Sequence, residues 1–138
     1  MTDAHLARKQ GGAGAIGPAG LHLAIIVAGI SLYLLIRIAL APAGGWLRFH
    51  ATDVLAGLIL PSLFALWPDP PRSLAALNAG LSGKLLLVLA AAFVWEVVHP
   101  LASKASTGDW RDVVAYVVGC LLQHALVRGW AALCPPRR

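Results

Sequence analysis

Four long runs of apolar residues, separated by short polar segments, dominate the pattern of this chain. The runs cover residues 21–41, 51–67, 81–99 and 112–133. An α-helix needs about 20 apolar residues to cross a hydrocarbon core about 30 Å thick. The pattern therefore predicts an all-α fold, a polytopic membrane protein in which residues 19–138 form a bundle of four transmembrane helices with both termini on the same side.

The segments around these runs carry turn signals. Residues 1–18 are rich in glycine and lack apolar periodicity, which predicts a flexible N-terminal tail. Prolines and glycines at 42–45 and the PDPPR segment at 68–72 predict turns, and the polar stretch 103–111 predicts a loop. We expect Pro61 to kink the second helix and Pro100 to end the third. A cleaved signal peptide is the alternative for the first run, although its 21 residues exceed a usual signal core.

Composition agrees with a lipid environment. Apolar residues make up 59% of the chain and charged residues 12%, so a water-soluble domain of this size would lack a polar surface. The net charge of +5 would suit nucleic acid in a soluble protein. Here, however, the basic residues lie at the ends of the apolar runs, so we expect no nucleic-acid partner.

The distribution of basic residues predicts the orientation of the bundle. Seven lysines and arginines fall on the side of the termini and four on the other side. The seven are Arg8, Lys9, Arg72, Lys84, Arg128, Arg137 and Arg138, and the four are Arg37, Arg48, Lys104 and Arg111. Because cytoplasmic loops carry the excess of positive charge, the termini are predicted to be cytoplasmic.

Most of the acidic residues gather at the end opposite the termini. Four of six lie there, namely Asp53, Glu96, Asp109 and Asp112, and they are joined by Arg37, Arg48, His50, His99, Lys104 and Arg111. Each predicted helix thus contributes to one outward-facing polar mouth. Glu96 stands out because its neighbours are apolar, and a carboxylate at that depth must be paired, protonated or next to water. The alternative is a structural Glu96 that reaches the interface or bonds to Arg37.

Two of these patterns also have plain structural explanations. Glu96 and His99 share the Glu-x-x-His spacing of carboxylate-bridged metal bundles, but such sites need two pairs and more carboxylates. A metal site built from Glu96, His99, Asp109 or Asp53 is therefore the weaker alternative, and we expect no metal and no cofactor. Asp109 and Asp112 precede an apolar run in the manner of a helix cap and an acidic first turn, and Asp53, three residues after His50, starts its helix similarly.

The fourth run carries a small and polar face. Tyr116, Gly119, Cys120 and Gln123 follow helical spacing, with Gly119 allowing a neighbouring helix to approach closely. We expect this face to serve packing, and a polar relay that continues through His124 and Arg128 is the alternative.

One region resembles a known family. The stretch 93–123 (FVWEVVHPLASKASTGDWRDVVAYVVGCLLQ) is similar to the C-terminal half of VanZ-like membrane proteins, which carry Glu-x-x-Gln at the end of one span and Asp-x-x-x-Asn-x-x-Gly at the start of the next. Glu96, Asp109, Asp112 and Gly119 carry the likeness, whereas His99 stands in place of Gln and Tyr116 in place of Asn. The resemblance implies a small multi-pass protein of the bacterial inner membrane, in a family linked to resistance against lipoglycopeptide antibiotics.

These observations define candidate residues and competing functions. The candidate ligand-binding residues are Glu96, Asp109, Asp112, Arg111, His99, Asp53 and Arg37. Mixed arginines and carboxylates suit a polar lipid head group or a lipid-linked cell-envelope intermediate, with membrane lipids as the partners. The alternatives are an accessory subunit of a larger membrane complex and an intramembrane lipid-modifying enzyme that uses Glu96 as a base. The common nucleotide, hydrolase, zinc-protease and redox motifs are absent, so the sequence names no reaction.

Overall fold

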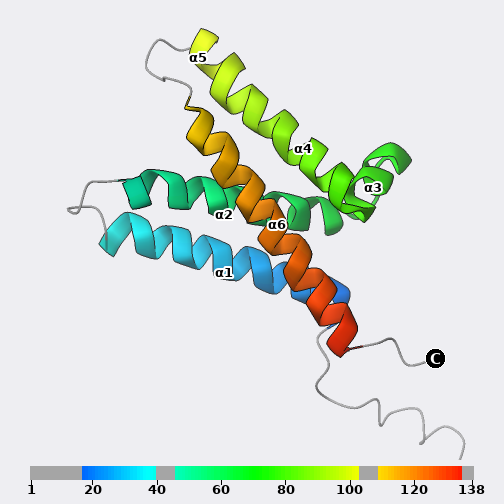
Figure 1. The fold of residues 1–138 in the computed structure, drawn as a ribbon. Coiled ribbons are helices and arrows are strands. Elements are labelled where there is room, and N and C mark those ends of the chain that lie inside the picture. The colour runs from blue at the N-terminus through cyan, green and yellow to red at the C-terminus, as the bar shows by residue number, and fades with distance from the viewer. Residues whose placement is uncertain (1–16, 40–45, 103–108, 135–138) are drawn as a thin grey trace, which may run out of the picture.

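The computed structural model describes residues 17–39, 46–102 and 109–134, and this part of the chain is all-helical, as predicted (Figure 1). Residues 1–16 of the expected N-terminal tail and the turn and loop residues at 40–45 and 103–108 lie outside the described residues. The elements are α1 (Pro18–Ala39), α2 (Trp46–Ala65), α3 (Arg72–Ala79), α4 (Leu81–Phe93), η2 (Val94–Val98), α5 (His99–Ala102) and α6 (Trp110–Leu133).

Three helical segments are long and apolar enough to cross a membrane. They are Pro18–Ala39, Leu81–Val98 and Trp110–Leu133, and α2 contributes a shorter apolar stretch, His50–Ala65. These segments expose many large hydrophobic side chains, including Ile38, Trp95 and Leu133. Such a surface is stable in lipid and not in water, so the chain has the properties of a membrane protein.

The helix boundaries differ from the predicted ones where local chemistry overrides hydropathy. Helix α1 begins at Pro18, inside the segment predicted as a tail, because proline fits the first turn of a helix without losing a hydrogen bond. Helix α2 begins five residues earlier than the apolar run and continues through Pro61. The short helix α3 was not predicted, and it ends where Gly80 takes an extended conformation.

The helices pack in the spatial order α1, α2, α6, α4. Helix α2 lies beside α1 and carries the most extensive contact in the molecule, with α6, which crosses it obliquely (Figure 1). Helix α4 packs on α6, and a small core of Val88, Ala92, Tyr116 and Cys120 lies between them. This order brings the start of α2 close to the start of α6, although the two are far apart in the sequence.

Two glycines allow α2 and α6 to touch through their backbones. A Cβ atom on Gly57 would overlap the backbone carbonyl of Tyr116, and a Cβ atom on Gly119 would overlap that of Val54. The prediction that Gly119 admits a neighbouring helix is confirmed, and so is the buried face of Tyr116, Cys120 and Gln123. Close backbone contact of this kind is how membrane helices associate when lipid leaves no hydrophobic driving force between them.

The third apolar run does not end at Pro100, contrary to the prediction. It passes through the π-helical turn η2 and continues as α5, which contains Pro100. In η2 the backbone bonds span five residues, as between the N–H of His99 and the carbonyl of Val94. A π turn already departs from the i to i−4 pattern that a proline interrupts, so the helix tolerates Pro100 just after it.

A chain of hydrogen bonds joins four helices at the other end of the bundle. The Lys84 ammonium donates to Gln123 Oε1 at 2.9 Å, and Gln123 Nε2 donates to Ser62 Oγ at 3.1 Å. His22 Nδ1 lies 3.3 Å from the same hydroxyl. Lys84 is only 5% exposed, so this lysine is buried in the bundle and does not act as the loop charge that the count of basic residues assumed.

Candidate functional site: a polar cluster at the start of α2 and α6

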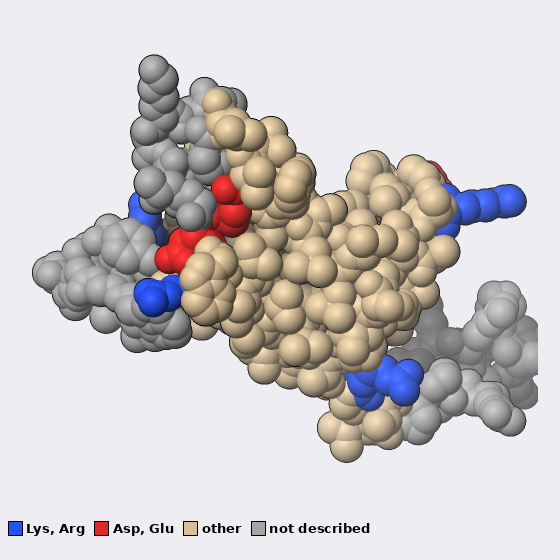
Figure 2. Space-filling view, turned by 45° about the horizontal axis from the view of Figure 1, so that its top comes forward, with Lys and Arg blue, Asp and Glu red and all other residues tan. Residues whose placement is uncertain are grey.

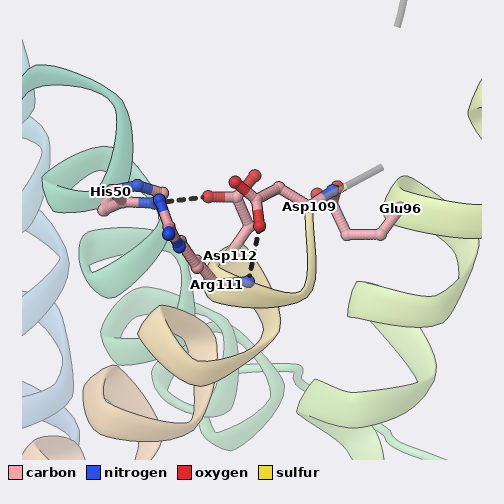
Figure 3. A network of polar contacts seen from close by, with 5 residues as sticks. All are labelled: His50, Glu96, Asp109, Arg111 and Asp112. Carbon is pink, nitrogen blue, oxygen red and sulfur yellow. Dashed lines mark hydrogen bonds and ion pairs between the residues drawn. The ribbon is translucent and has the colours of Figure 1, made fainter. Parts of the chain in front are cut away.

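A histidine and two aspartates meet where α2 and α6 begin. His50 Nδ1 lies 2.6 Å from Asp112 Oδ1 (Figure 3). A ligating atom from each of His50, Asp53 and Asp112 falls within 4.8 Å of the other two. We call these three residues the His–Asp–Asp cluster. His50 is 8% exposed and both aspartates are half-buried, so the cluster is only partly accessible to solvent.

The local sequence explains how the cluster forms. His50 and Asp53 are three residues apart on α2 and therefore share one helix face. Asp112 lies in the first turn of α6, where its negative charge is favoured by the helix dipole. Tyr116, one turn further along α6, interacts with the Asp53 carboxyl. The contact of the two backbones at Gly57 and Gly119 fixes the helices one or two turns below the cluster.

Two carboxyl groups lie close together in this cluster and repel each other when both are charged. The carboxyls of Asp53 and Asp112 interact directly with each other. Two carboxylates this close repel unless a proton or a cation lies between them. Within the described part of the chain, the partner that can neutralise these carboxyls is His50. It forms an ion pair with Asp112 only when its imidazole is protonated. The three side chains together offer one nitrogen and several oxygens, a donor set that can hold a divalent metal ion.

Glu96 and Asp109 have mainly structural partners. The Glu96 carboxylate accepts a hydrogen bond from the backbone N–H of Asp109 at 3.2 Å, which ties η2 to the start of α6. Asp109 is the N-cap of α6, and its side chain accepts from the backbone N–H of Arg111 at 2.9 Å (Figure 3). Both contacts bring these residues next to the His–Asp–Asp cluster, as the sequence predicted for this end of the bundle.

An apolar groove leads away from the cluster. It has a volume of about 340 Å³ and lies between α1, α2 and α6. Its walls are apolar and its polar end is formed by His50 and Arg111. The apolar lining residues are Leu32, Ile36, Ala51, Val54, Leu55, Val114, Ala115 and Val118. The volume is within the range of about 300–1,000 Å³ that is usual for ligand pockets.

Two candidate residues lie outside this arrangement. His99 is exposed and stacks on Trp95, with ring centroids 5.4 Å apart. Arg37 is exposed at the end of α1 and lies over the ring of Tyr33. The spacing of Glu96 and His99 predicts a shared face in an α-helix, but Val94–Val98 is a π turn, and Glu96 bonds to Asp109 while His99 stacks on Trp95. Nor is an ion pair recorded between Arg37 and Glu96, both of which are described.

His50 belongs to the site although the sequence does not single it out as a ligand. Its partner Asp112 is 62 residues away on another helix, so no local pattern joins the two. The spacing of His50 and Asp53 was the available signal. Figure 2 shows the resulting distribution of charge, with most of the visible carboxylates gathered at one end of the molecule and basic side chains both there and at the far end.

Comparisons with family models, with curated proteins and with solved structures found no match to this chain.

Proposed function

We propose that this protein binds an amphiphile, a membrane lipid or a lipid-linked cell-envelope intermediate, with the polar head group at the His–Asp–Asp cluster and Arg111. The observation that carries the proposal is the apolar groove that ends at His50 and Arg111. A groove with apolar walls and one polar end is complementary to a lipid, which has apolar chains and a polar head group. An arginine at that end suits a phosphate, and neighbouring carboxylates accept hydrogen bonds from hydroxyl or amine groups.

The proposed setting is a four-span protein of a bacterial inner membrane. Helix α2 has 20 residues, which at about 1.5 Å per residue reach about 30 Å, enough for a fourth span. Ala24, near the start of α1, and Leu126, near the end of α6, line one pocket, which supports placing both termini on the same side. The likeness of residues 93–123 to VanZ-like proteins supports a role at the cell envelope.

The decisive experiment measures lipid bound to the purified protein in mild detergent by native mass spectrometry. Val118→Phe fills the groove from α6, and Leu122→Phe places the same side chain on an exposed position of the same helix. We expect the first variant to lose most of the bound lipid and the second to keep it.

A second pair of variants tests the polar end. Arg111→Gln removes the groove arginine, and Arg128→Gln removes an exposed arginine near the far end of α6. A lost charge-assisted hydrogen bond costs about 1.5–3 kcal/mol, so Arg111→Gln should weaken lipid retention by about tenfold or more. Equal retention in all four variants would refute the groove as the binding site. A stoichiometric protein partner with no bound lipid would favour the accessory-subunit alternative.

A further inference from the structure

The His–Asp–Asp cluster has the donors and spacing of a metal site. Three ligating atoms, one imidazole nitrogen and two carboxylate oxygens, already lie within 4.8 Å of one another. Around a tetrahedral ion with bonds of about 2.0–2.2 Å, ligand atoms are about 3.3–3.6 Å apart. The side chains of His50, Asp53 and Asp112 therefore need to move by about 1 Å or less to surround one ion.

The surroundings of the cluster favour a cation independently of its spacing. His50 is more than nine-tenths buried, and its ring nitrogen points at Asp112 (Figure 3). Arg111 reaches toward His50 and lines the polar end of the groove with it (Figure 3), its guanidinium carbon lies 5.9 Å from the centre of the Trp110 ring, and in the part of the chain that the structure describes it forms no ion pair with the cluster. Asp53 and Asp112 interact directly, and within the described residues neither forms an ion pair with a lysine or arginine.

The scaffold around the donors is rigid. His50 and Asp53 sit on one face of α2, Asp112 sits in the first turn of α6, and the two backbones are in contact at Gly119. Metal sites built on helices in fixed contact need little rearrangement on binding. The Tyr116 side chain interacts with Asp53 and can orient that carboxylate, as residues that contact metal ligands commonly do.

We propose that His50, Asp53 and Asp112 bind one divalent first-row transition metal ion, with Zn²⁺ as the representative ion. One nitrogen and two oxygen donors suit Zn²⁺, Mn²⁺ or Fe²⁺ better than Ca²⁺ or Mg²⁺, which take oxygen ligands. Three protein ligands leave a coordination position open beside the polar end of the groove. The ion takes the place of the hydrogen between His50 Nδ1 and Asp112 Oδ1; a neutral imidazole keeps its proton on Nε2, and an imidazolium releases one proton to solvent. This metal site is a separate proposal from lipid binding and does not depend on it.

The test uses the full-length protein in detergent, stripped with a chelator and then equilibrated with Zn²⁺. Metal content measured by mass spectrometry should reach one ion per chain. Co²⁺ in place of Zn²⁺ should give the visible absorption of a coordinated ion. Asp53→Asn, Asp112→Asn and His50→Gln should each lower the affinity for Zn²⁺ by at least tenfold.

Matched controls separate coordination from general attraction of cations. Asp69→Asn and His99→Gln change the same residue types at exposed positions outside the cluster and should leave the affinity for Zn²⁺ unchanged. Glu96→Gln removes a nearby charge but no proposed ligand, so it should lower the affinity less than Asp53→Asn does. Absence of a stoichiometric ion, equal binding by the cluster variants, or an equal loss in His99→Gln would overturn the proposal.

A further readout guards against misfolded variants and separates the two proposals. Zn²⁺ should raise the thermal unfolding temperature of the unmodified protein and leave that of folded Asp53→Asn unchanged, and an equal rise in both would overturn the site. Lipid is measured in the same samples. Lipid retained by a protein that takes up no Zn²⁺ overturns the metal site alone, and Zn²⁺ bound by a protein that retains no lipid overturns the proposed function alone.

Discussion

The Glu96 carboxylate accepts a hydrogen bond from the backbone N–H of Asp109 at 3.2 Å, across the connection between the third and fourth apolar segments. The N–H of a residue just before a helix has no partner within that helix, and here a side chain from a preceding element supplies the partner. The most conspicuous acidic residue in the sequence thus fixes where α6 begins, and through α6 it fixes where Asp112 lies.

Two substitutions at Glu96 should show whether its hydrogen bond to Asp109 or its negative charge stabilises the protein. In Glu96→Gln the amide oxygen can still accept the bond, so we expect the free energy of unfolding to change by less than about 0.5 kcal/mol. In Glu96→Leu the Asp109 N–H loses its partner, at a cost of about 1–3 kcal/mol. Thermal unfolding in detergent measures both, and an equal loss in the two variants would contradict a role based on this hydrogen bond.

The N-cap of α6 gives a second test. The Asp109 side chain accepts from the Arg111 N–H, and Asn keeps that ability while Ala does not. We expect Asp109→Ala to destabilise the protein by about 1 kcal/mol and Asp109→Asn by a few tenths. Circular dichroism during thermal unfolding measures the difference. Equal stability of the two variants would show that the cap contributes nothing.

The contact of α2 with α6 should be sensitive to a single methyl group. In Gly57→Ala and Gly119→Ala the added carbon meets backbone atoms that cannot rotate away, so we expect a loss of about 1–3 kcal/mol or more. Gly129→Ala is the control, because a Cβ at Gly129 would have no neighbour within 4 Å. The same unfolding measurement applies, and the first two variants should also separate His50 from Asp112. Tolerance of alanine at both positions would contradict the packing described above.

Lys84 and Gln123 are hydrogen-bonded to each other in the interior. We therefore expect the effects of their single substitutions on stability not to add in the double variant. Gln123→Leu leaves a buried ammonium without its recorded acceptor, which is costly, whereas Lys84→Met removes the charge together with the need for that acceptor. We expect Gln123→Leu to lower the unfolding temperature more than Lys84→Met, and the double variant to recover most of the loss. Additive effects in the double-mutant cycle would show that the two side chains are not coupled.

The two cysteines provide a test of orientation. Cys134 is exposed after α6 and Cys120 is buried, so a membrane-impermeant thiol reagent should label Cys134 alone. If the termini are cytoplasmic, labelling in intact cells should appear only after the inner membrane is opened. Trp110→Cys in a Cys134→Ser background is the control, because position 110 is exposed at the opposite end and should react without opening. The reverse pattern would invert the proposed topology.

Sequence patterns predicted the helical class and the gathering of acidic residues because these depend on local hydropathy and on which end of a helix a residue occupies. Residue spacing also predicted the buried face of α6, including Gly119 and Gln123. The expectation that Glu96 and His99 share a face assumed α-helical geometry, whereas Val94–Val98 forms a π turn. The bond between His50 and Asp112 could not be predicted from spacing at all, since it depends on how two distant helices cross.

The separation of these last two residues along the chain has a consequence for biogenesis. His50 and Asp112 are 62 positions apart, so a ribosome that adds about 5–20 residues per second needs about 3–12 s to synthesise the second partner after the first. During that interval the hairpin of α1 and α2 is already available to the membrane with His50 and Asp53 unmatched by α6. A chain truncated before α6 therefore leaves His50 without the Asp112 carboxylate that it contacts in the complete bundle.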